Sequence, residues 1–333
     1  MGLTYEEIKE TNERPLPQLE DQDIAGRTVV VTGANTGIGY EVTKYMAKYN
    51  ASKIILACRN KSKGQDAIAR IANDTGRDVG AFECWPLDLA SMASVRCFAK
   101  RYNDSGLFLH IFIHNAAMVV MGQGKLISED GFDLTLQANY IAPTLLSVLL
   151  YPVLERTGAL DKADPARFIW VISGVPSLPF NESADAHPIE AMNKQAFDLS
   201  GTKPHWPYLA AKLTCLLACH EYARRIPSSA NIAVAAATPG VVASELGQKD
   251  VNGNNFQAMD IEKFTHVRPR TCEEGASAED DRPAGDIPRR GGVEGGAAQC
   301  SPFHEHAGDG LAVFLRDGRG RDAGRFGQTP LVF

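Results

Sequence analysis

The hydrophobic pattern divides the middle of the chain into short apolar runs separated by longer segments with helical periodicity. The runs are apolar at consecutive positions, as in VVVT at 29–32 and IILA at 54–57. Consecutive apolar positions are typical of strands that helices cover on both faces, so the alternation predicts a parallel sheet. The expected strands are 27–32, 53–57, 80–86, 110–114, 167–173 and 231–237. The expected helices are 38–49, 64–73, 92–102, 131–156 and 208–225.

This order predicts an α/β fold of the Rossmann-like type, a doubly wound parallel sheet in a single domain that binds ligands at the carboxyl ends of its strands. We expect an N-terminal extension at 1–22, a Rossmann-type catalytic domain at 23–266 and an irregular or disordered tail at 267–333. Within the domain, residues 174–207 form an insert that is too long for a simple connection. Such an insert favours a pocket wall or a lid.

The tail differs from the domain in composition. After Lys263 there is no further Lys, Asn, Tyr, Trp or Met, while Gly and Arg become dense. Periodicity disappears as well, apart from a strand-like LAVFL at 311–315, and this composition is typical of irregular chain. A frame shift or an unspliced intron would leave the same pattern. Tryptic peptides from Asp286 onward in the native protein would exclude that alternative.

Overall composition excludes several classes of protein. The 333 residues are 44% hydrophobic and 22% charged, near the globular average, so the chain is neither wholly disordered nor fibrous. The formal net charge of -6 offers no general attraction to the phosphates of nucleic acid or to anionic lipid. We therefore expect no nucleic-acid partner.

Cysteine usage and the N-terminus indicate the compartment. The 7 cysteines are scattered and never spaced Cys-x-x-Cys, which favours reduced thiols in an intracellular protein. His304 and His306 have no third ligand at a sensible spacing, so no metal site is expected. The N-terminus is acidic, unlike a secretory signal, and no run approaches the ~20 apolar residues that span a bilayer. We expect a cytoplasmic protein without a membrane span.

Three glycines follow the first strand, in the run TGANTGIG at 32–39 that opens the first helix. Glycine allows a sharp turn and a close approach of the backbone to a pyrophosphate, whose charge meets the free amides at the positive end of the helix. An ordinary glycine-rich loop is the alternative, but the place between strand and helix favours dinucleotide binding. The predicted cofactor-binding residues in this turn are Gly33, Asn35, Thr36, Gly37, Ile38 and Gly39.

The end of the second strand predicts the type of dinucleotide. The segment ACRNK at 57–61 has no carboxylate for the ribose 2′-hydroxyl of NAD. Arg59 stands there instead, and a guanidinium can pair with a 2′-phosphate and stack on adenine. We therefore predict NADP as the cofactor. A solvated arginine at a strand end is the alternative.

Three polar residues predict the chemistry. Tyr208 and Lys212 lie four residues apart in a predicted helix, hence on one face, and an ammonium beside a phenol should lower the pKa of Tyr208 towards neutrality. Ser173 ends the fifth strand, where its hydroxyl can hydrogen-bond a carbonyl oxygen on which charge develops. Taken singly, such a pair is commonly surface decoration and such a serine caps a turn. Together, behind a dinucleotide turn, they predict a catalytic site.

In this order the residues resemble the short-chain dehydrogenase/reductase family over about 23–246. Its TGxxxGxG pattern is matched by the three glycines of the turn, and its YxxxK pattern by Tyr208 and Lys212. The further matches, in the expected order, are Asp88 with Leu89, Asn115 with Ala116, Asn139, Ser173, Pro239 with Gly240, Val242 and Ser244.

The resemblance implies roles for these residues. Tyr208 would give a proton to the substrate oxygen in reduction or remove one in oxidation. Lys212 would also hold the nicotinamide ribose, and Asn139 would support a water that relays protons to Lys212. Beside the turn, the implied cofactor-binding set is Arg59, Asp88, Leu89, Asn115, Ala116, Tyr208, Lys212, Pro239, Gly240, Val242 and Ser244.

Substrate and assembly are implied by the resemblance as well. The ACRN after the second strand and the long insert look most like the branch that holds retinol dehydrogenases, the WW-domain oxidoreductase and protochlorophyllide reductase. That branch implies an NADP(H)-dependent oxidoreductase that interconverts a carbonyl and an alcohol on a mid-sized lipophilic substrate, such as a polyketide, terpenoid, steroid or retinoid. We expect a role in secondary metabolism. Helices of this family commonly pair across a homodimer.

Two alternatives stay open at the level of the sequence. One is a non-catalytic NADPH-binding sensor or scaffold with a compromised substrate pocket, because the family pattern breaks in the tail. The other is a different reaction on the same fold, such as epimerisation or dehydration, which a single YxxxK does not distinguish.

Overall fold

The computed structural model describes residues 12, 23–119, 126–173, 206–246, 270–276 and 313–316, and these contain a sheet of seven strands in the order β3-β2-β1-β4-β5-β6-β7. Strands β1 to β6 are parallel, and β7 pairs antiparallel with β6. The fold class is confirmed, with the order reversing between β1 and β4. The strands are β1 Thr28–Thr32, β2 Lys53–Cys58, β3 Phe82–Pro86, β4 Ile111–His114, β5 Ala166–Val171, β6 Ile232–Ala237 and β7 Val313–Arg316.

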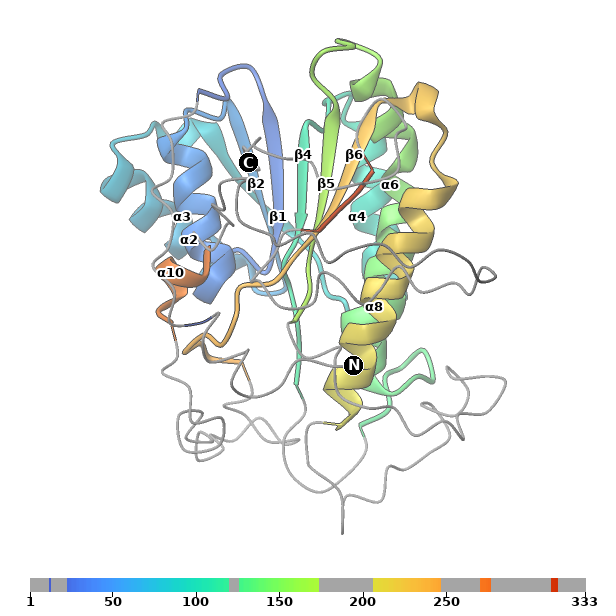
Figure 1. Cartoon of the computed structure of the whole chain (residues 1–333). Helices are drawn as coiled ribbons and strands as arrows, with labels where there is room; N and C mark the ends of the chain where they lie inside the picture. The colour runs from blue at the N-terminus through green and yellow to red at the C-terminus, as the bar shows by residue number, and fades with distance from the viewer. Residues whose placement is uncertain are drawn as a thin grey trace, which may run out of the picture.

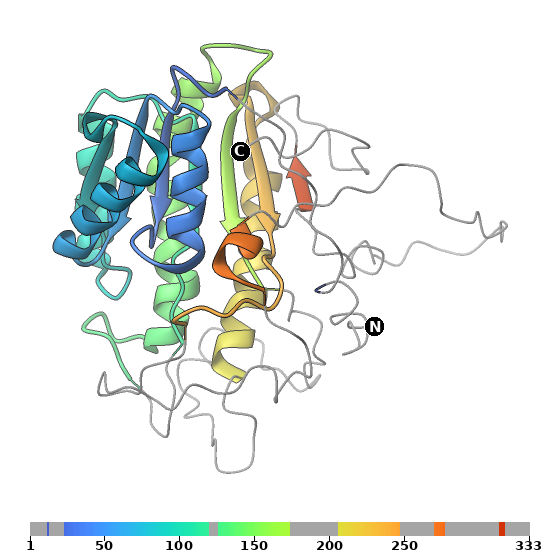
Figure 2. The same ribbon diagram turned by 90° about the vertical axis from the view of Figure 1, so that its left-hand side faces the viewer.

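Helices cover both faces of the sheet (Figures 1 and 2). One face carries α2 Gly37–Lys48, α3 Lys61–Thr75 and α10 Cys272–Ala276, and the other carries α4 Met92–Asp104, α6 Ala142–Gly158 and α8 Trp206–Arg225. The shorter elements are η1 Val79–Ala81, α5 Leu134–Leu136, the π-helical turn η2 Gln137–Ile141 and η3 Ser228–Ala230.

Two hydrophobic cores explain the consecutive apolar positions of the strands. Val30 of β1 packs in the core beneath α4, α6 and α8, while Val29 and Val31 pack in the core beneath α2 and α3. Successive side chains of a strand point to opposite faces, so a strand between two helical layers needs apolar residues at every position. The largest fully buried side chains include Trp170, Phe98 and Tyr102, all in the first core.

Two helices begin three residues away from the expected position. The helix expected at 64–73 runs over Lys61–Thr75, because the Asn60 side chain accepts a hydrogen bond from the Lys63 amide and Gly76, at φ 67°, ends the helix. The helix expected at 131–156 begins at Leu134 and ends at Gly158, with the π-helical turn inside it. Capping residues set helix ends, whereas the apolar pattern marks only the buried middle.

The helical stretch Leu134–Gly158 is long and apolar enough to cross a membrane by length and composition, and it is the one such segment among the described residues. Within its most apolar window, 56% is buried inside the fold. Packing against the sheet and α4 therefore accounts for much of this apolar character.

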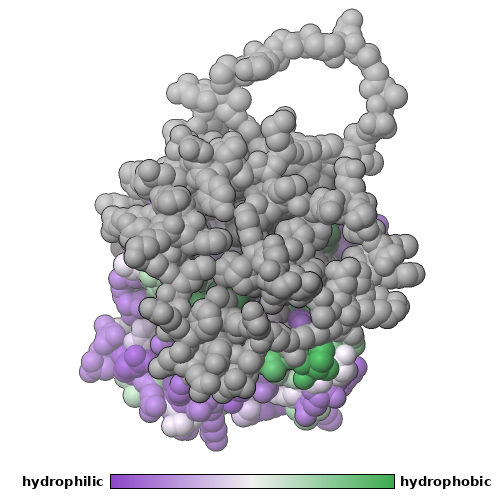
Figure 3. All heavy atoms as spheres, turned by 90° about the horizontal axis from the view of Figure 1, so that it is seen from below, coloured by the Kyte–Doolittle hydropathy of each residue, from purple (hydrophilic) through white to green (hydrophobic). Residues whose placement is uncertain are grey.

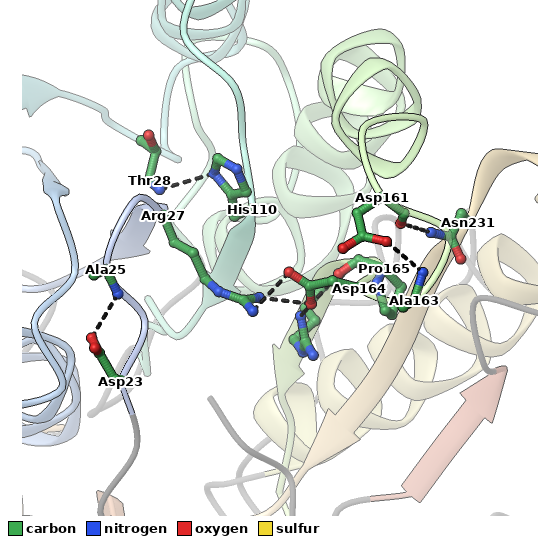
Figure 4. Close-up of polar contacts among 11 residues, drawn as sticks. Asp23, Ala25, Arg27, Thr28, His110, Asp161, Ala163, Asp164, Pro165 and Asn231 are labelled. Atoms are coloured by element: carbon green, nitrogen blue, oxygen red, sulfur yellow. Dashed lines mark hydrogen bonds and ion pairs between the residues drawn. The ribbon is translucent and has the colours of Figure 1, made fainter.

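The amino end of the sheet is tied by polar contacts (Figure 4). Arg27 forms an ion pair with Asp164 at 2.7 Å, and Asn231 donates hydrogen bonds from its amide to the carbonyls of Gly158 and Asp161. These contacts close the end of the fold opposite to the one where ligands are expected.

The outer segments are described only in part. The extension at 1–22 is described at Asn12 alone, the insert at 174–207 only where it enters α8, and the tail at α10 and β7. The strand-like 311–315 corresponds to β7 at Val313–Arg316, so this part of the tail pairs with the sheet. The rest of the expected irregular tail lies outside the described residues.

Candidate active site

The turn between β1 and α2 fits only glycine at its critical positions. Gly33 and Gly37 have φ of 65° and 60°, a backbone conformation that disfavours other residues. A Cβ on Gly39 would lie 2.4 Å from the carbonyl oxygen of Gly33 and 2.5 Å from the side-chain nitrogen of Asn115. The turn thus folds tightly against its own start and against the end of β4.

The N-terminus of α2 is open to an anion. Thr36 is the N-cap residue with an extended backbone, its side chain makes no capping hydrogen bond, and the first turn contains no acidic residue. Amides at a helix start lack intrahelical partners and carry the positive end of the helix dipole. This end, with Asn35, Thr36 and Ile38, therefore fits the pyrophosphate of a dinucleotide.

The ends of β1 and β4 are joined beneath this turn. The Thr32 hydroxyl oxygen accepts the amides of Asn115 at 3.0 Å and Ala116 at 2.9 Å, and the Asn115 side chain donates to the Thr32 carbonyl at 3.0 Å. A Cβ on Gly33 would lie 3.0 Å from the Ala116 Cα. The structure therefore brings the predicted Asn115 and Ala116 against the glycine turn.

His114 belongs to the same cluster, and the sequence analysis missed it. Its Nδ1 lies 3.2 Å from the Thr32 hydroxyl. That oxygen already accepts two amides, so its proton points to Nδ1 and the other ring nitrogen, Nε2, carries the ring hydrogen. This nitrogen is buried without a hydrogen-bond partner among the described residues, and the ring packs edge-on against Trp170. Burial, and secondarily the charge of Lys212, lower the pKa of His114 to about 3.

We expect His114 to make the protein less stable in acid. The pKa of His114 is about 3 in the folded chain, below the ordinary value of 6.5. Between these two pH values the imidazole is protonated in the unfolded chain and neutral in the folded chain. Stability should be lost as pH falls from about 6.5 towards about 3, with a limiting slope of about 1.4 kcal/mol per pH unit. Urea unfolding at several pH values gives the free energy of unfolding as a function of pH. This free energy should change less with pH in His114→Asn than in the wild type. The same pH dependence of the unfolding free energy in both proteins would contradict this role of His114.

The second-strand end gathers positive charge. Arg59 is exposed directly after β2, and Lys61 and Lys63 are exposed in the first turn of α3. Asp88, after β3, uses a carboxylate oxygen to accept the Ala90 amide at 2.9 Å. Leu89 is buried in the core, so its side chain supports this edge from below.

The segment after β6 returns to the glycine turn. Gly240 has φ 75°, and Val242 pairs with Arg270, whose amide donates to the Val241 carbonyl at 2.8 Å. Arg270 also donates to the Pro239 carbonyl at 3.5 Å. A Cβ on Gly37 would lie 3.9 Å from the Ser244 Cβ. Thus Ser244 lies against the dinucleotide turn, and Arg270, which the sequence analysis missed, contacts Pro239, Gly240 and Val242 of the same segment.

Tyr208, Lys212 and Ser173 meet at the carboxyl end of β5. The Ser173 hydroxyl donates a hydrogen bond to the Tyr208 hydroxyl. The Lys212 ammonium lies 5.9 Å from the centre of the Tyr208 ring and donates to the Val171 carbonyl at 2.9 Å. Lys212 is only 2% exposed. The structure therefore assembles the three residues that the sequence predicted to act together.

The pKa of Tyr208 differs from the expectation. Burial raises it above the ordinary value, and the hydrogen bond from Ser173 lowers it only in part. Lys212 does not bring the phenol towards neutrality in this structure, because its ammonium is held over the ring by Val171 rather than at the hydroxyl. Burial also lowers the pKa of Lys212 itself. At neutral pH the phenol therefore keeps its proton.

Asn139 is buried in the π-helical turn, beneath the site. Its side-chain amide donates to the carbonyls of Met118 at 2.6 Å and Thr135 at 2.7 Å, and its oxygen accepts the Met118 amide at 3.1 Å. These contacts fix the segment after β4 to the helix. The implied relay between Asn139 and Lys212 stays a prediction.

Elsewhere in the described ranges, no group of three or more His, Cys, Asp or Glu is placed to hold a metal ion. His304 and His306 lie outside the described residues.

Sequence comparisons relate the chain to oxidoreductases. The family model of short chain dehydrogenase matches residues 27–179. A short chain dehydrogenase of Hypocrea jecorina is 30% identical over 274 residues, which cover 78% of this chain and 72% of that protein. The WW domain-containing oxidoreductase of Gallus gallus is 35% identical over 220 residues, 65% of this chain and 49% of that protein. Retinol dehydrogenase 12 of Mus musculus is 34% identical over 226 residues, 67% of this chain and 64% of that protein.

The fold is shared with solved structures. A short-chain dehydrogenase from Sphingobium yanoikuyae, crystallised in complex with NADPH, superposes with a TM-score of 0.55 at 19% identity, covering 76% of this chain and 82% of that one. The chain spans about half the length of the chicken relative, at 49%.

Proposed function

We propose that this chain, which belongs to the short-chain dehydrogenase family, is an NADP(H)-dependent oxidoreductase that interconverts a carbonyl and an alcohol on a mid-sized lipophilic molecule. The observation that carries the proposal is the hydrogen bond between Ser173 and Tyr208, with the buried Lys212 one helical turn away. A protein that only binds a dinucleotide has no need of this arrangement.

The chain's own residues supply the proton and polarise the substrate carbonyl. Bound NADPH supplies the hydride. Ser173 donates a hydrogen bond to the substrate oxygen as negative charge develops there, and Tyr208 then transfers its phenolic proton to that oxygen. Because burial raises the pKa of Tyr208, the phenol is protonated at neutral pH, which suits reduction better than oxidation. Lys212 would hold the nicotinamide ribose, the role that the family pattern implies for it.

The preference for NADP is proposed from the charge after β2. Three cationic side chains are exposed there, those of Arg59, Lys61 and Lys63. They would attract the 2′-phosphate of NADP. Arg59→Asp should weaken NADPH binding at least about tenfold and shift preference towards NADH, because a carboxylate repels the phosphate and can accept from a ribose hydroxyl. Quenching of protein fluorescence by each dinucleotide measures both effects.

Lys162→Asp is the matched control, since Lys162 is exposed at the amino end of the sheet and the charge change is identical. NADPH affinity should be unchanged in this variant. Equal losses in the two variants, or no shift in Arg59→Asp, would refute the role given to Arg59.

The lipophilic substrate is supported by a relative named as a retinol dehydrogenase at 34% identity. The test is oxidation of NADPH in the presence of apolar ketones and aldehydes compared with polar sugars. Turnover of the apolar set, lost on Tyr208→Phe, is the expected result. NADPH binding without turnover of any carbonyl would favour a sensor or scaffold instead.

Assembly and location complete the proposal. An apolar patch shows at the lower right of Figure 3. Val148 of α6 is 56% exposed and Leu217 of α8 is 47% exposed. We propose a homodimer through these helices, to be tested by sedimentation before and after Val148→Glu.

A cytoplasmic location agrees with the described cysteines, which are all free, and cell fractionation tests it.

A further inference from the structure

The N-terminal extension contributes a buried side chain to the segment that follows β6. Asn12 is 7% exposed, and it lies 229 residues before Val241 in the sequence. The side-chain oxygen of Asn12, Oδ1, accepts a hydrogen bond from the Val241 amide at 2.9 Å. No step of the proposed reaction uses Asn12. The extension is thus in direct contact with a segment that the sequence analysis assigned to the cofactor.

Gly240 makes this contact possible. Its φ is 75°, which favours glycine, and a Cβ there would lie 2.5 Å from the Oδ1 atom of Asn12. The backbone of Gly240 can therefore lie against the Asn12 side chain only because it carries no side chain of its own. A glycine is required at this position by the contact with Asn12 as well as by the turn.

Arg270 connects Asn12 to the rest of the segment. The Nε of Arg270 donates to the backbone carbonyl of Asn12 at 3.3 Å. The backbone amide of Arg270 donates to the Val241 carbonyl, and its carbonyl accepts the Ala243 amide, both at 2.8 Å. Residues 241–243 belong to no described helix or strand, so hydrogen bonds from these two residues hold their backbone.

The segment reaches the proposed pyrophosphate site. A Cβ on Gly37 would lie 3.9 Å from the Cβ of Ser244, and α10, which follows Arg270, packs against α2. In the sheet, β2 and β6 lie on opposite sides of β1. Because the 2′-phosphate is assigned to Arg59 after β2, the segment after β6 lies towards the nicotinamide half of the dinucleotide.

We propose that Asn12 is a positioning residue for the dinucleotide, which holds the backbone of 240–242 in the conformation that receives the nicotinamide half of NADPH. The inference rests on the proposed function for the identity of the cofactor. Asn12 acts through Gly240 and Val241, so its loss should raise the Kd and the KM for NADPH more than it lowers kcat.

The test compares ligand binding by full-length variants in fluorescence titrations. Asn12→Ala removes the acceptor of the Val241 amide and should raise the Kd for NADPH at least about fivefold. The adenosine half alone, 2′-phospho-AMP, should bind this variant within about twofold of the wild type, because it does not reach the segment after β6. An unchanged Kd for NADPH, or equal weakening of both ligands, would overturn the proposal.

Asn231→Ala is the matched control. Asn231 is another buried asparagine whose side chain joins distant segments, through the carbonyls of Gly158 and Asp161 at the amino end of the sheet. This variant should lose stability in urea unfolding and keep its Kd for NADPH within about twofold of the wild type. Equal losses of NADPH affinity in Asn12→Ala and Asn231→Ala would refute a specific role of Asn12.

A double-mutant cycle tests the contact between Asn12 and Gly240. Gly240→Ala should raise the Kd for NADPH at least about fivefold, because the new methyl group meets the Asn12 oxygen. Residues that act through one contact have non-additive effects, so the double variant should bind no more weakly than the weaker single variant. Losses that multiply in the double variant would show independent effects and contradict the proposal.

Hydrogen exchange separates this proposal from the proposed function. Without any cofactor, the Val241 amide should exchange at least about tenfold faster in Asn12→Ala than in the wild type. Equal exchange rates would overturn the role given to Asn12. If the wild type binds no NADPH, the proposed function fails, while the exchange rates still decide whether Asn12 holds Val241.

Discussion

Replacement of Tyr208 by phenylalanine should lower kcat by about 10²–10⁴ while leaving the Kd for NADPH within about twofold of the wild type. The substitution removes only the hydroxyl that Ser173 contacts, and the ring that packs beside Lys212 remains. Without this hydroxyl, the substrate oxygen loses the proton donor that the proposed mechanism assigns to it. Steady-state kinetics on the best apolar ketone, with fluorescence titration of NADPH, measures both quantities.

Tyr222→Phe is the control on the same helix. The Tyr222 hydroxyl donates to the Ser147 carbonyl at 3.1 Å, away from Ser173. Its loss should cost about 1 kcal/mol of stability and leave kcat unchanged. A Tyr208→Phe variant that turns over like the wild type would remove the phenol from the mechanism, and equal losses of kcat in both variants would indicate a structural effect on α8.

The parts of the site that sequence could predict have a local steric or chemical cause. Gly33 and Gly37 are required by positive φ, and the turn that needs them is contiguous in the chain. Tyr208 and Lys212 are neighbours through helical spacing alone. To predict that Ser173 lies near them, one further inference was needed, that the carboxyl ends of parallel strands lie at the same edge of the sheet.

The parts that were missed depend on contacts between distant segments. The hydrogen bond of His114 with Thr32 follows from the pairing of β1 with β4. Register between strands cannot be deduced from the spacing of apolar residues when both faces are buried, because every register buries them equally.

The direction in which the pKa of Tyr208 shifts could not be predicted from the sequence either. The sequence revealed the cation that would lower this pKa but not the depth of burial that raises it, nor the Val171 carbonyl that holds Lys212 over the ring. Spacing identifies which groups can interact, and the surrounding packing decides the sign of the net shift.

Gly39→Ala should weaken NADPH binding at least about a hundredfold. The added Cβ would lie 2.4 Å from the Gly33 carbonyl oxygen and 2.5 Å from the Asn115 side chain, so the turn must open and the start of α2 must move. The amides proposed to hold the pyrophosphate then lose their alignment. A stability cost of about 1–3 kcal/mol accompanies the overpacking. Fluorescence titration with NADPH and urea unfolding separate the two effects.

Gly158→Ala supplies a clash of the same size away from the dinucleotide. A Cβ there would lie 2.3 Å from the Ala230 carbonyl oxygen and 2.5 Å from that of Asn231, at the amino end of the sheet. This variant should lose stability as Gly39→Ala does and keep the wild-type Kd for NADPH within about twofold. If both variants lost affinity equally, weakened binding would reflect general destabilisation. If Gly39→Ala bound NADPH normally, the turn after β1 would not be the pyrophosphate site.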